Sequence, residues 1–415
     1  MIIKKIVTLS LILASIFETA QATSAQYLQI GSPNAMLFTI QGDIQGLMPG
    51  DTLSFERMSL PKYSSEYSFD VIVEKPDKFT YSGMHENIGL YVMRYKPISG
   101  KKIVADRMGV DFLVKDGITH LIGTTDQIYY VEIKGGIYDN DLLQEAQQLE
   151  ISLGKERGNL FGLLEEYRTA ENTEKIKEYS NKINMFYSER QEEHKKVSEL
   201  NAQYYENFPS SEHTVVDVLR GVSYRPFETT QSRYEKMDSE AMNSYFGKIL
   251  KLEMDKIARL QPGKDAPDFH LTAIDGREIF LSDCVGSYVL IYHWGLCPGS
   301  IMINSEVIDL HNKYIDRLKI IGITDKIEHI KNLYDNTKPE DKFMHIELKP
   351  VLENMLAHPW FDAEKTGNNS KIEIDYAFGG LPYFVFISPE GKIIARDFHS
   401  AFYEAKNTME NEFGK

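Results

Sequence analysis

The sequence predicts three parts in chain order: an all-β domain, a helical region, and an α/β C-terminal domain whose mixed sheet is covered by helices on both faces. Three observations lead to this interpretation. Short strand-like segments alternate with turns from Ala35 to about Gly135. Apolar residues then recur every three to four positions from Asp141 to about Asn207. After Pro262, strand patterns alternate with helix patterns. The expected domains are residues 30–136, 139–261 and 263–415.

The first 22 residues have the pattern of a secretory signal peptide. Lys4 and Lys5 precede the apolar run Ile6–Phe17, and Ala20 and Ala22 form the small-x-small motif of a cleavage site. This run of 12 residues is shorter than the roughly 20 needed to cross a bilayer as a helix. We therefore expect an exported mature chain without a membrane span, periplasmic if the source is a Gram-negative bacterium. An uncleaved N-terminal anchor is the competing interpretation.

Charge and length narrow the classes of protein further. The 415 residues include 61 acidic and 46 basic side chains, a net charge of −15, which disfavours nucleic acid and anionic membranes as partners. A chain of this length predicts two or three domains. Two cysteines are too few for a disulfide scaffold in an exported protein of this size.

The N-terminal segment has the spacing of a β-sandwich or an open barrel. Bursts such as "DTLSFERM" and "GLYVMRY" are separated by turn sequences such as "MPGD" and "EKPD". No catalytic constellation lies within it. Its histidines, His85 and His120, are isolated from other reactive residues, and we expect them to be surface or hydrogen-bonded histidines.

The helical region predicts an antiparallel hairpin of two helices separated by "TAENTE". Its apolar stripe is interrupted at Arg190 and Glu193. Gly154, Gly158 and Gly162 each cost about 1 kcal/mol of helix propensity, so the first helix either breaks there or permits a close backbone contact. An intermolecular coiled coil stays open as an alternative. Further helices are expected over Glu212–Arg220 and Asp238–Leu260.

The C-terminal segment reads as an entry hairpin followed by alternating strands and helices. The expected elements are a loop and hairpin over residues 262–283, a buried strand over Tyr288–His293, a helix over Ser300–Tyr314, a strand at "LKIIGIT", a helix near "IEHIKNLYDN", a hairpin joining "PYFVFIS" to "KIIARDF", and a last helix at "SAFYEAKNTMENEF".

Three of these segments carry a family resemblance. "GKDAPDFHLTAIDGREIFLSD", "YVLIYHWGLCPGS" and "GGLPYFVFISPEGKII" resemble the entry, active-site and cis-proline segments of exported thiol-disulfide oxidoreductases of the AhpC/TSA (redoxin) superfamily. The resemblance implies a thioredoxin-like fold and redox activity without a bound cofactor or metal. The N-terminal β-rich part is similar, more weakly, to an extension often fused to such domains, for which the family offers no defined activity.

A cysteine placed where a strand leads into a helix has a chemical reason to be reactive. Unpaired N–H groups and the positive end of the helix dipole favour the thiolate, and Cys297 has this position. Pro298 suits the first helical turn. The resemblance implies that Pro382 is a cis-proline facing the cysteine, and that Trp294, Pro298 and Leu381 contact the substrate.

The motif departs from the family at its second cysteine, which is replaced by Ser300. A serine there can donate a hydrogen bond to the thiolate, but it cannot attack a mixed disulfide. Cys284 lies before a strand about 20 Å long and Cys297 after it, whereas a disulfide needs Cα atoms within about 7 Å. We therefore expect no pairing, and an external thiol would have to release any adduct.

The sequence fits a peroxidase or a metal site less well than a thiol-disulfide oxidoreductase. A peroxidase of the superfamily would have threonine where Trp294 stands. A metal site is disfavoured because His293, His358 and His399 are dispersed, and His293 is expected as a hydrogen-bonded core residue. Two hypotheses remain open: an oxidoreductase using Cys297 on protein or small-molecule disulfides with an external reductant, and a non-catalytic binding module for envelope proteins.

Overall fold

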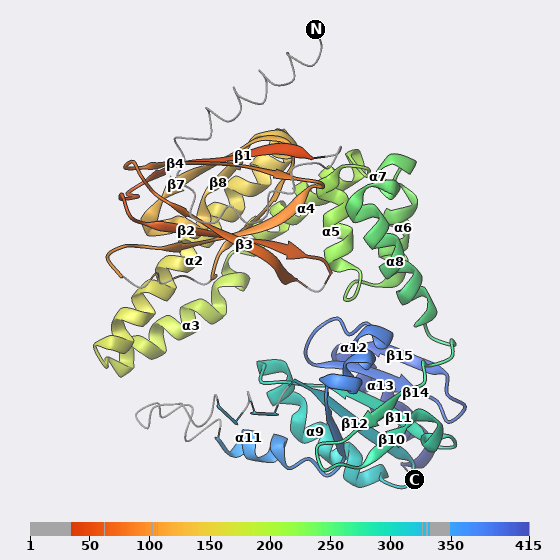
Figure 1. The fold of residues 1–415 in the computed structure, drawn as a ribbon. Coiled ribbons are helices and arrows are strands. Elements are labelled where there is room, and N and C mark those ends of the chain that lie inside the picture. Colours follow the sequence, from red (N-terminus) through yellow and green to blue (C-terminus); the bar gives the residue numbers. More distant parts are fainter. Residues whose placement is uncertain are drawn as a thin grey trace. The chain divides into compact units, whose positions relative to one another are not determined.

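The computed structural model describes residues 35–414, apart from residues 62, 101, 102, 104, 106, 326, 329, 330 and 333–348 (Figure 1). The expected signal peptide and most of the helix expected near residues 327–336 lie outside the described residues. The chain divides into two compact units, Met1–Ser59 with Tyr63–Gln203 and Leu60–Lys62 with Tyr204–Lys415. Among the described residues, no helix is long and apolar enough to cross a membrane.

The first unit contains two four-stranded sheets that share one core, so the sandwich is the correct alternative for this segment. Alternation along the strands sends Phe38 and Ile40 from one sheet and Phe55 from the other into that core. All neighbouring strands are antiparallel except the pair β1 and β7. In sheet order the strands are β4 (Lys78–His85), β1 (Met36–Gln45), β7 (Gly117–Thr124) and β8 (Glu132–Lys134), and β3 (Ser64–Ile72), β2 (Thr52–Ser59), β5 (Gly89–Lys96) and β6 (Val110–Val114).

The two histidines of the sandwich differ from each other. His120 lies 2.7 Å from an oxygen of Asp43, so its expected hydrogen bond is present. His85 is 5% exposed, and neither ring nitrogen has a hydrogen-bond partner among the described residues. Burial lowers the pKa of His85 to about 4. The expectation of a surface or hydrogen-bonded residue was therefore wrong for His85, because apolar alternation along β4 carries it into the core.

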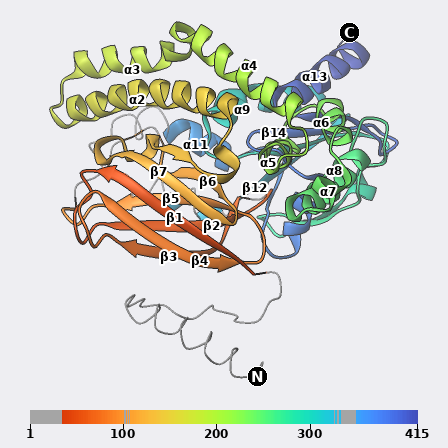
Figure 2. The same cartoon turned by 90° about the horizontal axis from the view of Figure 1, so that it is seen from above.

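The predicted helical hairpin consists of α2 (Asp141–Thr169) and α3 (Thr173–Glu189), which run side by side in Figure 2. A third helix, α4 (Gln191–Asn207), follows after a break at Arg190, where the apolar stripe was interrupted. Helix α2 is continuous through its glycines. A Cβ on Gly154 would lie 2.3 Å from the Tyr130 ring, so the glycine permits the close contact rather than a break.

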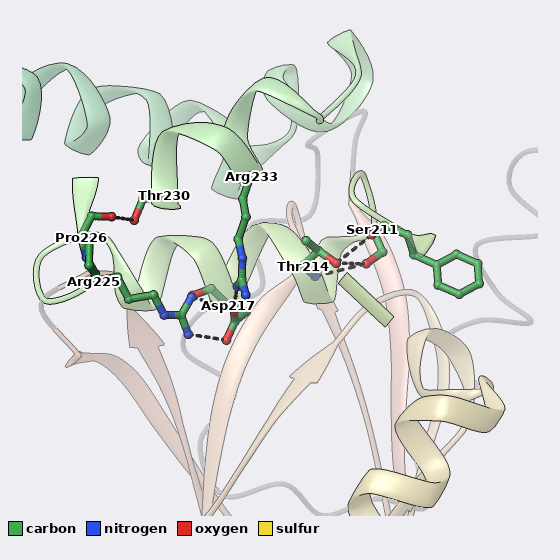
Figure 3. Close-up of polar contacts among 8 residues, drawn as sticks. Ser211, Thr214, Asp217, Arg225, Pro226, Thr230 and Arg233 are labelled. Atoms are coloured by element: carbon green, nitrogen blue, oxygen red, sulfur yellow. Dashed lines mark hydrogen bonds and ion pairs between the residues drawn. The ribbon is translucent and has the colours of Figure 1, made fainter. Parts of the chain in front are cut away.

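The second unit begins with four short helices, α5 (Glu212–Gly221), α6 (Phe227–Glu235), α7 (Ser239–Asn243) and α8 (Tyr245–Arg259). Helix α6 was not predicted. The single helix expected from Asp238 is divided at Ser244, whose hydroxyl caps α8 by accepting the Gly247 N–H. Figure 3 shows how Asp217 on α5 accepts hydrogen bonds from Arg225 at 2.7 and 2.9 Å and from Arg233 at 3.0 Å.

The C-terminal domain of this unit has the predicted mixed sheet. Strands β13, β12 and β11 are parallel, and β14 and β15 are antiparallel to their neighbours. A separate hairpin precedes the sheet, as expected. In chain order the elements are β9 (His270–Thr272), β10 (Glu278–Phe280), β11 (Tyr288–His293), α9 (Pro298–Tyr314), β12 (Leu318–Thr324), α11 (Lys349–Leu356), β13 (Phe361–Glu364), α12 (Lys371–Tyr376), β14 (Tyr383–Ile387), β15 (Ile393–Asp397) and α13 (His399–Phe413).

Helices cover both faces of this sheet. One face presents Leu290 and Tyr292 of the central strand β11 to helices α9 and α13. The opposite face presents His293 to Phe378, which follows helix α12. Strand β11 is hydrogen-bonded on both sides and buried on both faces, which explains its continuous apolar sequence. Its C-terminal end leads directly into the segment that contains Cys297.

Candidate functional site

Cys297 is the N-cap residue of α9. Its backbone is extended, with φ −105° and ψ 154°, and its sulfur accepts a hydrogen bond from the Ser300 N–H at 3.3 Å. Pro298 occupies the first helical position, where no N–H is needed. The cysteine is half-buried, whereas Cys284 is buried. The sulfur therefore lies beside unpaired N–H groups at the positive end of a 17-residue helix.

Ser300 lies beneath the sulfur and is completely buried. Its Oγ is 3.2 Å from the Cys297 Sγ and also accepts the Gly295 N–H at 3.4 Å. The Tyr292 hydroxyl donates to the Ser300 carbonyl at 3.3 Å, and burial raises the pKa of Tyr292, so this hydroxyl stays protonated. The serine hydroxyl is thus fixed against the sulfur. When the sulfur is a thiolate, the hydroxyl can turn its proton toward it.

Pro382 lies against the first turn of α9. The Leu381–Pro382 peptide bond is cis, and the proline is buried. A Cβ on Gly299 would lie 2.8 Å from the Pro382 Cδ, and one on Gly295 would lie 2.7 Å from a Leu381 methyl carbon. Two glycines in the cysteine segment therefore allow the proline segment to approach closely.

His293 connects the two segments from the interior. Its Nδ1 is 2.9 Å from the Gly380 carbonyl oxygen, and because a carbonyl only accepts, Nδ1 carries the proton. Burial lowers the pKa of His293 to about 3, so the ring is neutral. The ring stacks on Phe378, and its Nε2 is buried without a partner. The predicted core histidine is therefore only half hydrogen-bonded.

Arg396 on β15 holds the start of the same proline segment. Its guanidinium donates to the carbonyls of Tyr376 at 3.3 Å and Ala377 at 3.0 Å. Ala377 has φ 46°, in the left-handed region that ends helix α12. Burial lowers the pKa of Arg396. The segment from Tyr376 to Pro382 is thus fixed by donors on two strands, β11 and β15.

Cys284 lies at the other end of β11, in a short 3₁₀ turn, and is 5% exposed. Both cysteines are free thiols, in agreement with the predicted lack of pairing. Burial raises the pKa of Cys284, and its thiol donates a weak hydrogen bond to the Phe280 carbonyl at 3.7 Å. The chain has two cysteines, so no other thiol within it can release an adduct from Cys297.

The residues expected to bind substrate occupy different environments. Pro298 is exposed, and Leu381 is half-buried beside Gly295. Trp294 is 1% exposed and points into the core, where its indole N–H donates to Asp362 at 2.9 Å. A side chain buried in this way has no surface open to a substrate, which differs from the substrate contact expected for Trp294.

Sequence reasoning missed a polar cluster behind the cysteine. His358 contacts Asp362 and Asn304 at 2.8 Å each, so it is part of a network rather than a dispersed residue. His358 and Asp362 are four residues apart, but Asn304 lies 54 residues before His358, and the three match no motif. Within the part of the chain that the structure describes, no group of three or more histidine, cysteine, aspartate or glutamate side chains is arranged to hold a metal ion.

Comparison with known proteins gives matches among solved structures only. No protein-family model and no curated protein matches the chain. The thioredoxin domain of a thiol-disulfide oxidoreductase from Bacteroides vulgatus is similar at 19% identity and a TM-score of 0.27, covering 36% of this chain and 98% of that one. A thiol:disulfide interchange protein from a Bacteroides species (22%, TM-score 0.28, 38% and 93%) and a thiol-disulfide oxidoreductase from Bacteroides fragilis (24%, 0.26, 35% and 99%) are also similar.

Proposed function

We propose that this chain is an exported thiol-disulfide oxidoreductase with a thioredoxin-like C-terminal domain and a single nucleophilic cysteine, Cys297. One observation supports the proposal most directly. The only accessible thiol among the two cysteines lies at a helix N-terminus, with the N–H and hydroxyl of Ser300 at 3.3 and 3.2 Å from its sulfur. These groups stabilise negative charge on sulfur, which is the form that attacks disulfides.

The proposed reaction has two exchange steps. The Cys297 thiolate attacks one sulfur of a substrate disulfide, forming a mixed disulfide and releasing the other substrate sulfur as a thiolate, which takes a proton from solvent. An external thiolate then attacks the substrate sulfur of the adduct, which forms a new disulfide and regenerates the Cys297 thiolate. The external thiol is required because Ser300 cannot perform this step. The net result of these two steps is that one substrate sulfur leaves as a thiol and the other is joined to the external thiol. Complete two-electron reduction of the substrate disulfide takes a second external thiol.

Protein disulfides, small disulfides and an external thiol reductant are thus the proposed partners. Pro382 would shape the substrate side of the site, with Pro298 and Leu381 as contact residues. The proposal includes a cleaved signal peptide over residues 1–22, a periplasmic location, a β-rich domain over residues 30–136 and a thioredoxin-like domain over residues 263–415. It includes no cofactor.

A second candidate function is a non-catalytic binding module in the cell envelope. The observation that favours it is the buried Ser300 hydroxyl, which occupies the position of the family's second cysteine and has no redox chemistry. On this alternative, Cys297 would react no faster than an ordinary thiol. The rate of its reaction with a disulfide therefore separates the two functions.

The test uses the full mature chain with oxidised glutathione as the disulfide. We expect the native protein to gain one glutathione on Cys297, faster than the same chain unfolded in urea. Cys284→Ala is the matched control and should react like the wild type, whereas Cys297→Ala should gain none. Intact mass and peptide mapping measure the adduct. Equal rates in the native and unfolded chains would contradict the proposal and favour the binding module.

A further inference from the structure

Asp362 on β13 is a buried carboxylate behind the cysteine segment, and its side chain is 13% exposed. Burying a carboxylate is costly unless hydrogen-bond donors surround it. Three donors do so: the Trp294 indole at 2.9 Å and the Trp360 indole at 3.3 Å on one oxygen, and His358 Nδ1 at 2.8 Å on the other. The site for this carboxylate is therefore built by side chains from two segments, one that contains Trp294 and one that contains His358 and Trp360.

The sheet itself leaves room for the carboxylate. Tyr292, Gly322 and Asp362 are aligned across β11, β12 and β13. A Cβ on Gly322 would lie 1.7 Å from an Asp362 oxygen and 2.9 Å from the Trp294 indole nitrogen. Only the absence of a side chain at Gly322 lets Asp362 reach across the middle strand to Trp294.

The contacts of Asp362 lead to both ends of the cysteine segment. Trp294 follows β11 directly and stands three residues before Cys297. On the other side, His358 continues from Asp362 to Asn304, its Nε2 lying 2.8 Å from the Asn304 Oδ1. Asn304 is 4% exposed and lies on α9, one helical turn after Ser300.

We propose that Asp362 is a positioning residue for Cys297: its carboxylate, lying over Gly322, holds Trp294 before the cysteine and, through His358 and Asn304, helix α9 after it. This inference rests on the proposed function of Cys297. Reactivity depends on where the sulfur lies relative to the helix N–H groups and the proline segment, and displacements of about 1 Å can reduce rates by as much as about a hundredfold.

The test measures the reaction of Cys297 with oxidised glutathione in a Cys284→Ala background. Asp362→Asn keeps the side-chain shape and one carbonyl oxygen but removes the negative charge and replaces the oxygen that faces His358 Nδ1 with an amide N–H₂. We expect the reaction to be about tenfold slower. Asp265→Asn is the control, because this exposed carboxylate of the same domain pairs with Lys392 at the surface. It should react like the parent protein.

Tryptophan fluorescence supplies a second measurement, because a loss of stability alone would not change the emission response of the folded protein. The chain has two tryptophans, and both donate to Asp362. In the parent protein, adding glutathione to Cys297 should change the emission through Trp294. In Asp362→Asn, measured well below its unfolding temperature, this response should be lost. Gly322→Ala, which displaces the carboxylate without altering it, should reproduce both effects and serves if Asp362→Asn does not fold.

Two outcomes overturn the inference and are distinguishable. In the first outcome, the parent thiol reacts quickly, and a folded Asp362→Asn or Gly322→Ala variant reacts at a rate within about twofold of the parent and shows the same emission response. The positioning role is then wrong, and the proposed function stands. If the parent thiol itself reacts no faster than in urea, the proposed function falls and the positioning role falls with it.

Discussion

The two ends of strand β11 carry the chain's two cysteines in opposite environments. Before the strand, Cys284 is buried in a 3₁₀ turn, and burial raises the pKa of its thiol. After the strand, Cys297 is half-buried and accepts an N–H from the first turn of α9. The strand between them is only Tyr288–His293. Fold position rather than residue type therefore determines which thiol is suited to chemistry.

The same contrast extends to the neighbours of each sulfur. The Cys284 thiol contacts the Phe280 carbonyl, a group that cannot stabilise a thiolate, and the neighbouring Asp283 also raises its pKa. Cys297 has Ser300 beneath it and the segment of Pro382 against the next turn.

Supplying a second thiol at the Cys297 end should have the largest effect. Ser300→Cys places a sulfur where Oγ now lies 3.2 Å from Sγ, and a small shift brings it to the 2.05 Å of a disulfide. Because the attack becomes intramolecular, we expect the glutathione adduct to be released about a thousandfold faster than in the wild type. Adduct decay without added thiol, followed by mass spectrometry, measures this. A persistent adduct would show that the second thiol cannot reach the first.

Alkylation should distinguish the two ends directly. In the native protein, iodoacetamide should modify Cys297 about a hundredfold faster than Cys284, because Cys284 must await local opening and its pKa is raised by burial. Peptide mapping after timed quenching gives both rates in one sample. In urea the difference should disappear. Comparable native rates would contradict the assigned environments.

His293, the last residue of β11, should make the Cys297 end sensitive to acid. Its folded pKa is about 3, below the unfolded value of about 6.5, so the unfolded chain binds a proton that the folded chain does not. Its contribution is complete above about pH 6.5 and is lost as the pH falls toward 3. At pH 5 the loss is roughly 2 kcal/mol, or about thirtyfold in the folding equilibrium.

The matched variant for this prediction is His293→Asn, whose amide can still donate to the Gly380 carbonyl but does not titrate. Urea unfolding at pH 7 and pH 5 should show a smaller loss of stability in the variant than in the wild type. His85 titrates similarly in both proteins and cancels in the comparison. An identical loss in both proteins would show that His293 does not carry the effect.

Removing only the hydroxyl at the Cys297 end should have the smallest effect. Ser300→Ala keeps the backbone N–H that contacts the sulfur but removes the side-chain donor. A hydrogen bond to a charged group contributes about 1.5 kcal/mol, so we expect an approximately tenfold slower reaction with oxidised glutathione. Stopped-flow measurement of this reaction rate tests the prediction. Ser305→Ala, which changes a serine of α9 outside the site, is the control. Unchanged kinetics would remove Ser300 from the proposed chemistry.

The sequence patterns predicted the elements with strong periodicity. The apolar run of β11, the helical spacing of α9 and the hairpin of β14 and β15 match the expected residues closely. Weak patterns failed: β13 has four residues, α6 has nine mostly polar ones, and α7 and α8 were merged because Ser244 resembles an ordinary helical residue. Local propensity predicts such short elements poorly, since tertiary packing stabilises them.

The site was predictable where one segment carries it. Cys297, Pro298 and Ser300 lie within four residues, and their local spacing defines the helix N-terminus. The Asp362 network depends instead on two long-range contacts: Asp362 with Trp294 across Gly322, and His358 with Asn304. No periodicity marks such a cluster. Trp294 was misjudged for the same reason, because nothing near it in the sequence indicates a buried acceptor for its indole.

The Tyr130 ring, which lies against Gly154 and Gly158 of α2, has a consequence for the N-terminal unit. Added Cβ atoms would lie 2.3 and 3.1 Å from the ring, so these two positions form a notch in the helix surface. Sliding α2 along its axis by one residue would bring larger side chains against the tyrosine. The fit of the ring into the notch therefore fixes the register between this helix and the sandwich.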